Sequence, residues 1–411
     1  MLYTPSAKTG GIARARTARA MLFRAFVAQN CAVGCSYGGF GVSMLALQNR
    51  FDASRGAVSL GLSLVVLTGG LAGPLLAALQ RRFGLRNVMI AGAAMCSVGY
   101  ALAGLAPTLT GVLLAYGLFI GPGVGLSGTL PATLLVGGWY PHGRGKAIGL
   151  ATMPVVIALI PICAAALIEM RGLTAFYLAL AALHFATMPV LAGIHEAPVP
   201  VQAEEPHLDE LATTLRGLLA HPLFWAAMLG GGLLNAIGII GAVHMVGVVT
   251  ERGLPLMQAA LLASLMGGAS VVGAVAIGWL CDHVGGAWAL AAVAAGFAAS
   301  WATIAMTAQL PLMLPAILLI GIVGPGVYPG ISVLLARAFG AAMMARAMAL
   351  FGMFSIPMTF LLPPLAGWVH DSSGSYAAVM ATIVLVGGAV AAMFATVALR
   401  RPMSGGARSA R

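Results

Sequence analysis

Apolar residues run along most of this chain in long stretches that short polar or basic segments separate. A helix needs about 20 mostly apolar residues to cross the hydrocarbon core of a bilayer. At this length, the apolar pattern predicts about twelve transmembrane helices. Their expected positions are residues 24–47, 57–79, 88–107, 110–136, 147–169, 174–194, 222–249, 256–279, 288–308, 311–337, 345–369 and 376–399.

One extended polar stretch, residues 195–221, interrupts the pattern between the sixth and the seventh predicted helix. It is rich in proline and carboxylates and is too short for a domain of its own, so we expect a cytoplasmic linker. The predicted organisation is a basic cytoplasmic tail at 1–23, a six-helix bundle at 24–194, the linker at 195–221, a second six-helix bundle at 222–399 and a basic tail at 400–411.

The composition supports a membrane protein. Hydrophobic residues make up 60% of the chain and charged residues 8%, whereas soluble domains carry roughly 25% charged residues. The net charge of +11 comes from basic residues at the ends of apolar segments and in the tails, so it does not indicate nucleic-acid binding. The fold class is therefore all-α, in the lipid bilayer, and disorder or a secreted disulfide scaffold is excluded for the whole chain.

The five cysteines are odd in number and lie mostly inside apolar segments, which argues against a disulfide framework. Cys31 and Cys35 share one face of a helix, but the neighbouring sequence offers no histidine or carboxylate to complete a metal site. We therefore expect no metal and no cofactor.

Basic residues predict the orientation. With the amino terminus inside, the outer ends of the helices receive Arg50, Arg55, Arg171 and Arg252, and the other Lys and Arg residues fall on the inner side. Cytoplasmic loops carry an excess of Lys and Arg. Both termini are thus expected in the cytoplasm, and we expect a multi-pass protein of a bacterial inner membrane that functions as a monomer.

The two halves share short sequences at an offset of about 200 residues, and such a fixed period is the signature of an internal repeat. Repeated six-helix halves of the same orientation imply a two-fold axis along the membrane normal. The matches are Gly121–Val124 with Gly324–Val327, Asn30–Gly34 with Asn235–Gly238, and Lys146–Leu150 with Arg346–Leu350.

The loop after the eighth predicted helix contains Gly278, Asp282 and Gly285 in a pattern similar to the Gly-x-Leu-x-Asp-Arg-x-Gly motif of the major facilitator superfamily. The first-half loop keeps Arg82 and Gly84 but has Arg81 where that family has Asp. The chain resembles this superfamily over nearly its whole length. The resemblance implies two pseudo-symmetric bundles, a midplane binding site, and loops of residues 81–84 and 278–285 that take part in gating.

Within the superfamily the chain is most similar to the bacterial monocarboxylate-transporter-like branch, through residues 51–55, 139–147 and 367–376. That branch uses a Lys in the first helix and an Arg in the eighth to hold a carboxylate. Here the matching positions are the neutral stretch Tyr37–Gly41 and Ala274. A charge inside a membrane normally marks function, so the absence of these cations weakens the evidence for an acid as substrate.

The resemblance places the first, fourth, seventh and tenth helices around the central site. Polar residues on these helices are the candidates for substrate binding, namely Asn30, Tyr37, Tyr116, Asn235, His244 and Tyr328. Asn235 and His244 are nine positions apart and so project to opposite sides of one helix. Asn235, with Asn30 as its counterpart, is therefore the expected cavity residue.

His244 is also the candidate for proton coupling, because imidazole titrates near neutral pH. The alternative is a neutral imidazole that bonds a backbone carbonyl of a neighbouring helix. His184, on the sixth helix, is a second buried histidine for which a structural role is favoured.

The predicted function is secondary active transport by alternating access, of a small organic acid that moves alone or in symport with a proton. Export of neutral or amphiphilic compounds is the alternative within this fold. A membrane-embedded enzyme is disfavoured because the chain shows no nucleophile and base pair at helical spacing. A channel or sensor is disfavoured because the chain contains its own two-fold repeat.

Overall fold

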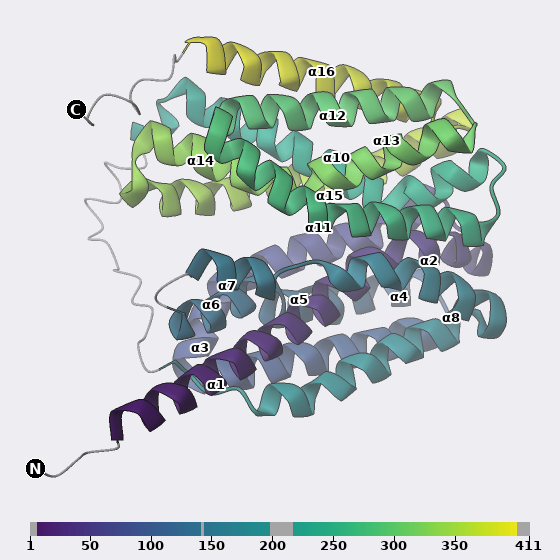
Figure 1. Cartoon of the computed structure of the whole chain (residues 1–411). Helices are drawn as coiled ribbons and strands as arrows, with labels where there is room; N and C mark the ends of the chain where they lie inside the picture. Colours follow the sequence, from purple (N-terminus) through teal and green to yellow (C-terminus); the bar gives the residue numbers. More distant parts are fainter. Residues whose placement is uncertain (1–5, 141–143, 198–216, 401–411) are drawn as a thin grey trace, which may run out of the picture. The chain divides into compact units, whose positions relative to one another are not determined.

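The computed structural model describes residues 6–140, 144–197 and 217–400 (Figure 1). Within these ranges the chain forms helices joined by turns and short connections, and it forms no strand. The helices of the first half are α1 (Ser6–Gln29), η1 (Asn30–Gly34), α2 (Cys35–Phe51), α3 (Arg55–Leu105), α4 (Leu109–Ala115), η2 (Tyr116–Ile120), α5 (Gly121–Ser127), α6 (Thr129–Trp139), α7 (Arg144–Ala151) and α8 (Val155–Ala192). Those of the second half are α10 (Pro222–Glu251), α11 (Leu256–Val284), α12 (Gly286–Met306), α13 (Leu310–Val323), η3 (Gly324–Gly326), α14 (Val327–Phe339), α15 (Ala341–Ser373) and α16 (Ala377–Arg400).

Every predicted span is mostly helical, and the fifth is interrupted at residues 152–154, between α7 and α8. Within the described ranges, 10 helices are long and apolar enough to cross a membrane. This number differs from the predicted one because Lys146–Ala192 contains both the fifth and sixth predicted spans, and because the first predicted span is not among the ten.

Two helices turn sharply inside their length. Gly84 (φ 77°) divides α3, and Gly172 (φ 84°) divides α8, since glycine tolerates a positive φ that other residues avoid.

The chain divides into two compact units, of which one is Met1–Ala53 with Ala57–Glu204 and the other Ser54–Gly56 with Glu205–Arg411. Most of the predicted linker, residues 198–216, lies outside the described ranges, as do residues 1–5 and 401–411 of the two predicted tails. The short segment Ser54–Gly56, at the start of α3, groups with the second unit through its contacts.

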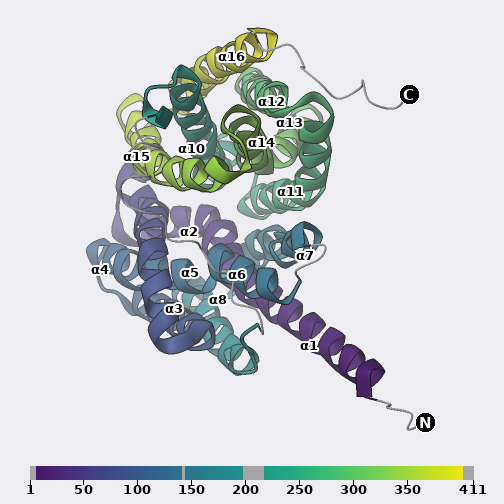
Figure 2. The ribbon, with the colours of Figure 1, turned by 90° about the vertical axis from the view of Figure 1, so that its left-hand side faces the viewer.

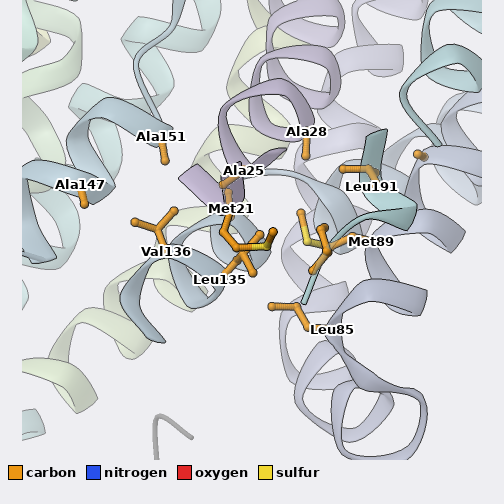
Figure 3. Packing of buried hydrophobic residues seen from close by; sticks show 13 residues of the cluster. Met21, Ala25, Ala28, Leu85, Met89, Leu135, Val136, Ala147, Ala151 and Leu191 are labelled. Carbon is orange, nitrogen blue, oxygen red and sulfur yellow. The ribbon is translucent and has the colours of Figure 1, made fainter. Parts of the chain in front are cut away.

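A core of small and flexible apolar side chains holds the first unit together at one end of its helices. Met21 and Ala25 of α1 pack there with Met89 of α3 and Val136 of α6 (Figure 3). Alanines on α1 and α7 let these helices approach closely, and the two methionines fill the remaining gaps. The basic first-half loop at 81–84 is thus anchored beside a dense core.

In the second unit, α12 packs against α16 and α13 (Figure 2). Its Phe297 and Trp301 side chains are fully buried. On the unit's surface, Val275 and Trp279 of α11 and Leu385 of α16 are exposed by 60% or more. A surface of this kind is expected of helices that face lipid, because hydrocarbon replaces water around them.

Two arginines show the internal repeat in three dimensions. Arg50 donates to the carbonyls of Gly104 and Ala106 at the end of α3, at 3.2 and 3.1 Å. Arg252 donates to the carbonyls of Thr307 and Ala305 at the end of α12, at 3.1 and 3.2 Å. Each guanidinium therefore caps the negative C-terminal end of a helix in its own unit.

Candidate functional site

Asn30 lies in the π-helical turn η1 and is 3% exposed. Its amide nitrogen donates to the carbonyls of Phe26 and Met153, at 3.1 and 3.0 Å, and its oxygen accepts from the amide of Val156 at 2.9 Å. The helix between α7 and α8 breaks here, which leaves backbone groups without helical partners. Asn30 bonds these groups, so its amide nitrogen and its oxygen are both engaged by the backbone, and its role in substrate binding stays a prediction.

Asn235 on α10 and Tyr328 on α14 come together in the second unit. The side chain of Asn235 lies close enough to the Tyr328 hydroxyl to interact with it, and the Tyr328 ring packs edge-on against Phe351 at 5.4 Å. Tyr328 is 49% exposed, although most large polar side chains of the spans are buried. The pair offers an amide and a hydroxyl to a ligand, and the prediction that these two residues form part of one site is consistent with this arrangement.

Tyr116 and Tyr37 differ from that pair in their surroundings. Tyr116, in the π-helical turn η2, is 2% exposed, and its hydroxyl is 3.2 Å from that of Tyr177. Its ring also meets Phe40 and Tyr100 edge-on. Tyr116 is thus part of a buried aromatic cluster, and its contact with substrate stays a prediction. Tyr37 is half-buried on α2 and has interactions of its own.

His244 is fully buried, and both of its ring nitrogens have partners. Nε2 is 2.9 Å from the carbonyl of Pro363, and Nδ1 is 2.9 Å from the hydroxyl of Tyr376. A carbonyl only accepts, so Nε2 carries the proton and Nδ1 accepts from the tyrosine. This arrangement matches the alternative of a neutral histidine bonded to a neighbouring carbonyl, although the residue stays a candidate for proton transfer.

Charged groups near Tyr376 extend this network. The Arg55 guanidinium lies 4.9 Å from the centre of the Tyr376 ring and 3.3 Å from Glu251, which is also 3.1 Å from His370 Nε2. Asp371 accepts from the backbone amides of Arg55 and Gly56. In the connection before α16, burial raises the pKa of Tyr376 to about 12, and the positive charge of Arg55 opposes this shift. The hydroxyl therefore keeps its proton at neutral pH. Sequence reasoning did not name Glu251, His370 and Tyr376 as site residues: Glu251 is in no motif, and the segment 367–376 was used only to place the chain within the superfamily.

The two predicted gating loops share a backbone turn and differ in their side chains. Gly84 (φ 77°, ψ 154°) and Gly285 (φ 85°, ψ 162°) adopt nearly the same conformation. After Gly84, a carboxylate oxygen of Glu196 accepts the amide of Leu85 at 2.9 Å, which is the contact a helix-capping carboxylate makes.

The remaining loop residues are placed differently. Beside Gly285 lies the guanidinium of Arg337. Arg81, Arg82 and Asp282 are exposed, and Gly278 is half-buried. Glu196 therefore supplies a helix cap in the loop where Arg81 replaces the expected Asp. No motif pointed to this residue, because it is over one hundred residues away along the chain.

One expectation about the cysteines is corrected by the fold. Cys31 and Cys35 have a histidine beside them, His184 of α8, which the sequence places far away. The ligand atoms of all three side chains lie within 4.8 Å of one another. The argument that no histidine stands near the two thiols was therefore wrong, because helix packing brings the first and sixth spans together.

Residues 27–355 match the family model described as Major Facilitator Superfamily. The chain belongs to this superfamily. Its members are transporters, so this protein is a multi-pass membrane transporter and not an enzyme.

Two curated relatives of the transporter are monocarboxylate transporters. It is 29% identical to Monocarboxylate transporter 13 of Bos taurus over 252 residues, which are 60% of this chain and 58% of the relative. It is 25% identical to Monocarboxylate transporter 11 of Homo sapiens over 370 residues, which are 84% of this chain and 76% of the relative. The alignment with the first relative thus spans less than two thirds of that protein's length.

Solved structures of other transporters share the fold. A mutant of the nucleoside transporter NupG aligns with a TM-score of 0.73 and 14% identity, over 93% of this chain and 99% of that one. A D-xylose–proton symporter aligns with a TM-score of 0.69 and 15% identity, over 91% and 96%. At such low identity these structures establish the architecture of the transporter and not its substrate.

Proposed function

We propose that the transporter moves a small organic acid across the membrane by alternating access, with Asn235 and Tyr328 in the substrate site. The observation that carries the proposal is this pair, a neighbouring amide and hydroxyl within membrane helices whose tyrosine is 49% exposed. Polar groups inside a membrane are costly and are usually functional when they remain accessible. The likeness to two monocarboxylate transporters supports the substrate class.

The neutral character of the pair limits the form of the substrate. An amide N–H and a hydroxyl can donate to a carboxylate, but they do not compensate its charge in a medium of low dielectric constant. Ala274 stands where the resemblance places an arginine. We therefore infer that the acid crosses with a proton, as a neutral pair, which removes the cost of burying an unpaired anion.

Counterflow in proteoliposomes tests the substrate class. We expect saturable exchange of radiolabelled lactate or pyruvate, inhibited by other short-chain acids and unaffected by xylose or uridine. Tyr328→Phe removes one donor and should raise the apparent KM about 10-fold, the equivalent of one hydrogen bond of about 1.4 kcal/mol. Tyr140→Phe, at the end of α6, is the matched control and should leave KM unchanged.

The same experiment distinguishes the alternatives. Exchange of neutral compounds without exchange of acids would replace the proposal by export of neutral or amphiphilic molecules. Flux that rises linearly with concentration and shows no counterflow would indicate a channel instead of a carrier.

Coupling to protons through His244 is the second part of the proposal. Protonation would make both ring nitrogens donors, and the oxygen of Tyr376 could then accept from Nδ1 in place of donating to it. Arg55, Glu251, His370 and Asp371 surround this tyrosine. We expect His244→Ala to abolish uptake driven by a pH gradient and to spare counterflow. Unchanged pH-driven uptake would remove His244 from the mechanism.

We also propose a monomeric protein of a bacterial inner membrane with both termini in the cytoplasm. The excess of Lys and Arg in the segments assigned to the inner side supports this orientation. A fluorescent protein fused to the carboxyl terminus should fluoresce in the cytoplasm, whereas the opposite orientation would leave it dark after export.

A further inference from the structure

Three side chains with affinity for soft metal ions meet inside the first unit. Cys31 lies in the π-helical turn η1, Cys35 is the first residue of α2, and His184 is on α8. Their exposed fractions are 6%, 1% and 1%. The two sulfur atoms and one ring nitrogen lie within 4.8 Å of one another.

The protonation of His184 is set by a second contact. Nδ1 is 2.8 Å from the carbonyl of Leu180, which accepts only, so Nδ1 carries the ring proton. Nε2 then presents a lone pair, and this buried atom has no hydrogen-bond partner among the residues that the structure describes. A histidine that donates the N–H of one ring nitrogen to a carbonyl and directs the other nitrogen inward has the orientation of a metal ligand. Without a ligand, a buried nitrogen that makes no hydrogen bond lowers the stability of the fold.

The helix around the thiols is unusual in the same place. Asn30–Gly34 forms a π-helical turn, a local widening that is rare and often marks a functional site. In such a turn residues four apart lie almost directly above one another, which brings the sulfurs of Cys31 and Cys35 to one side of the helix. That side faces His184.

Two neighbouring groups complete the surroundings. Thr187, one turn after His184, interacts with Cys31 through its hydroxyl, and its Oγ1 donates to the carbonyl of His184 at 2.7 Å. Cys96 of α3 also interacts with the imidazole, and the ring of Tyr100 lies 5.1 Å from it. The cluster is therefore enclosed, with a hydroxyl oxygen and a further thiol at its edge.

We propose that Cys31, Cys35 and His184 bind one zinc ion, which ties the first span to the sixth inside the first unit. Zinc accepts thiolate and imidazole ligands in this ratio. Binding displaces one proton from each thiol and involves no redox change, so the dication and two thiolates form a complex without net charge. A neutral complex suits an apolar interior, in which an unbalanced charge is costly. The hydroxyl of Thr187 is the neutral candidate for the fourth position.

The geometry requires only a small contraction. Ligand atoms in a tetrahedral zinc site are about 3.7 Å apart, as follows from Zn–S near 2.3 Å and Zn–N near 2.0 Å. The observed separations of up to 4.8 Å thus close by about 1 Å through side-chain rotation. Such a site stabilises the fold and takes no direct part in transport, so it can be tested without a transport assay.

The first test is the metal content of the purified full-length transporter, expressed with zinc in the medium and dialysed against a weak chelator. We expect close to one zinc per chain, and an X-ray absorption spectrum with Zn–S distances near 2.3 Å. Cys31→Ser, Cys35→Ser and His184→Asn should each lose most of the zinc. Cys281→Ser, a buried thiol of the second unit, is the matched control and should keep it.

A second test uses the unaltered chain, so it holds even where a variant does not fold. Zinc should slow alkylation of Cys31 and Cys35 by N-ethylmaleimide, followed by peptide mass spectrometry, and should leave the rate at Cys281 unchanged. It should also raise Tm by several degrees, as a ligand specific to the native state does. The proposal is overturned by a protein that holds no zinc and shows no protection, by a spectrum with only nitrogen and oxygen ligands, by equal zinc loss in Cys281→Ser, or by retention of copper in place of zinc.

Discussion

Asn30 and Asn235 occupy matching positions in the two halves of the chain, but their side chains have different partners. Asn30 bonds three backbone groups, at Phe26, Met153 and Val156. Asn235 pairs with a side chain, Tyr328. The difference begins in the partner helix, because the chain leaves the helical conformation just before α8, at Pro154 (φ −84°, ψ 61°), whereas α15 continues through Pro357 without a break.

A proline disfavours helical geometry in the residue before it and removes one backbone donor. In the first unit this breaks the helix and creates groups that need Asn30. In the second unit the helix is retained, and Asn235 remains available to a side chain and to a ligand. Symmetry in the sequence therefore predicts where polar residues lie, and the local state of the neighbouring helix decides what each one does.

Replacing each asparagine by leucine breaks this comparison most directly. Asn30→Leu removes three hydrogen bonds to backbone groups, leaves the Val156 amide without the oxygen that accepts from it, and should reduce the free energy of unfolding by about 3 kcal/mol. Asn235→Leu removes one side-chain bond at a partly exposed place and should cost under about 1 kcal/mol while impairing transport. Thermal unfolding in detergent measures the first effect and counterflow the second. Equal losses of Tm in the two variants would contradict the assignment of different roles.

The two arginine caps should behave alike, which sharpens the contrast with the asparagines. Arg50→Gln and Arg252→Gln each remove a charged donor from two carbonyls at a helix end. We expect each to lower the free energy of unfolding by about 2 kcal/mol, the range for hydrogen bonds to charged groups. Arg171→Gln, at an exposed position, is the control and should change Tm little. If the two substitutions lowered the free energy of unfolding by clearly different amounts, the two helix caps would not contribute equally to stability.

The smallest expected effect is at the first gating loop. Glu196→Ala removes the acceptor of the Leu85 amide and should cost about 1 kcal/mol, as the loss of a helix cap usually does. Glu196→Gln keeps an oxygen at that place and should recover most of the stability. If the alanine and glutamine variants melt together and below the unaltered chain, the negative charge and not the hydrogen bond is responsible.

The sequence was sufficient to predict the fold because twelve apolar stretches and their repeat impose strong constraints. Only helices and closed barrels satisfy the backbone inside a bilayer, so hydrophobic length alone determines the elements. The remaining differences are in detail. At Gly84 and at Gly172 the chain turns so tightly that two predicted spans join without a loop between them. The first pair of spans forms α3 and the second pair lies in α8.

The candidate site was predicted only in part. The resemblance named Asn235 and Tyr328 among the residues around the central site, but it did not predict that these two side chains lie beside each other. The roles of Asn30, Glu196 and His184 were not predicted either, because each depends on a contact between residues more than one hundred positions apart. Periodicity along a chain carries no information on such contacts.

The accessibility of the thiols has a practical consequence. Cys163 on α8 is exposed, and the other four cysteines are buried. A membrane-permeable fluorophore that reacts with sulfhydryl groups should therefore attach much faster at Cys163 than at the buried thiols of the unmutated chain. Fluorescence from that label would report changes around the fifth span during turnover, without the background mutations that a cysteine-free derivative requires.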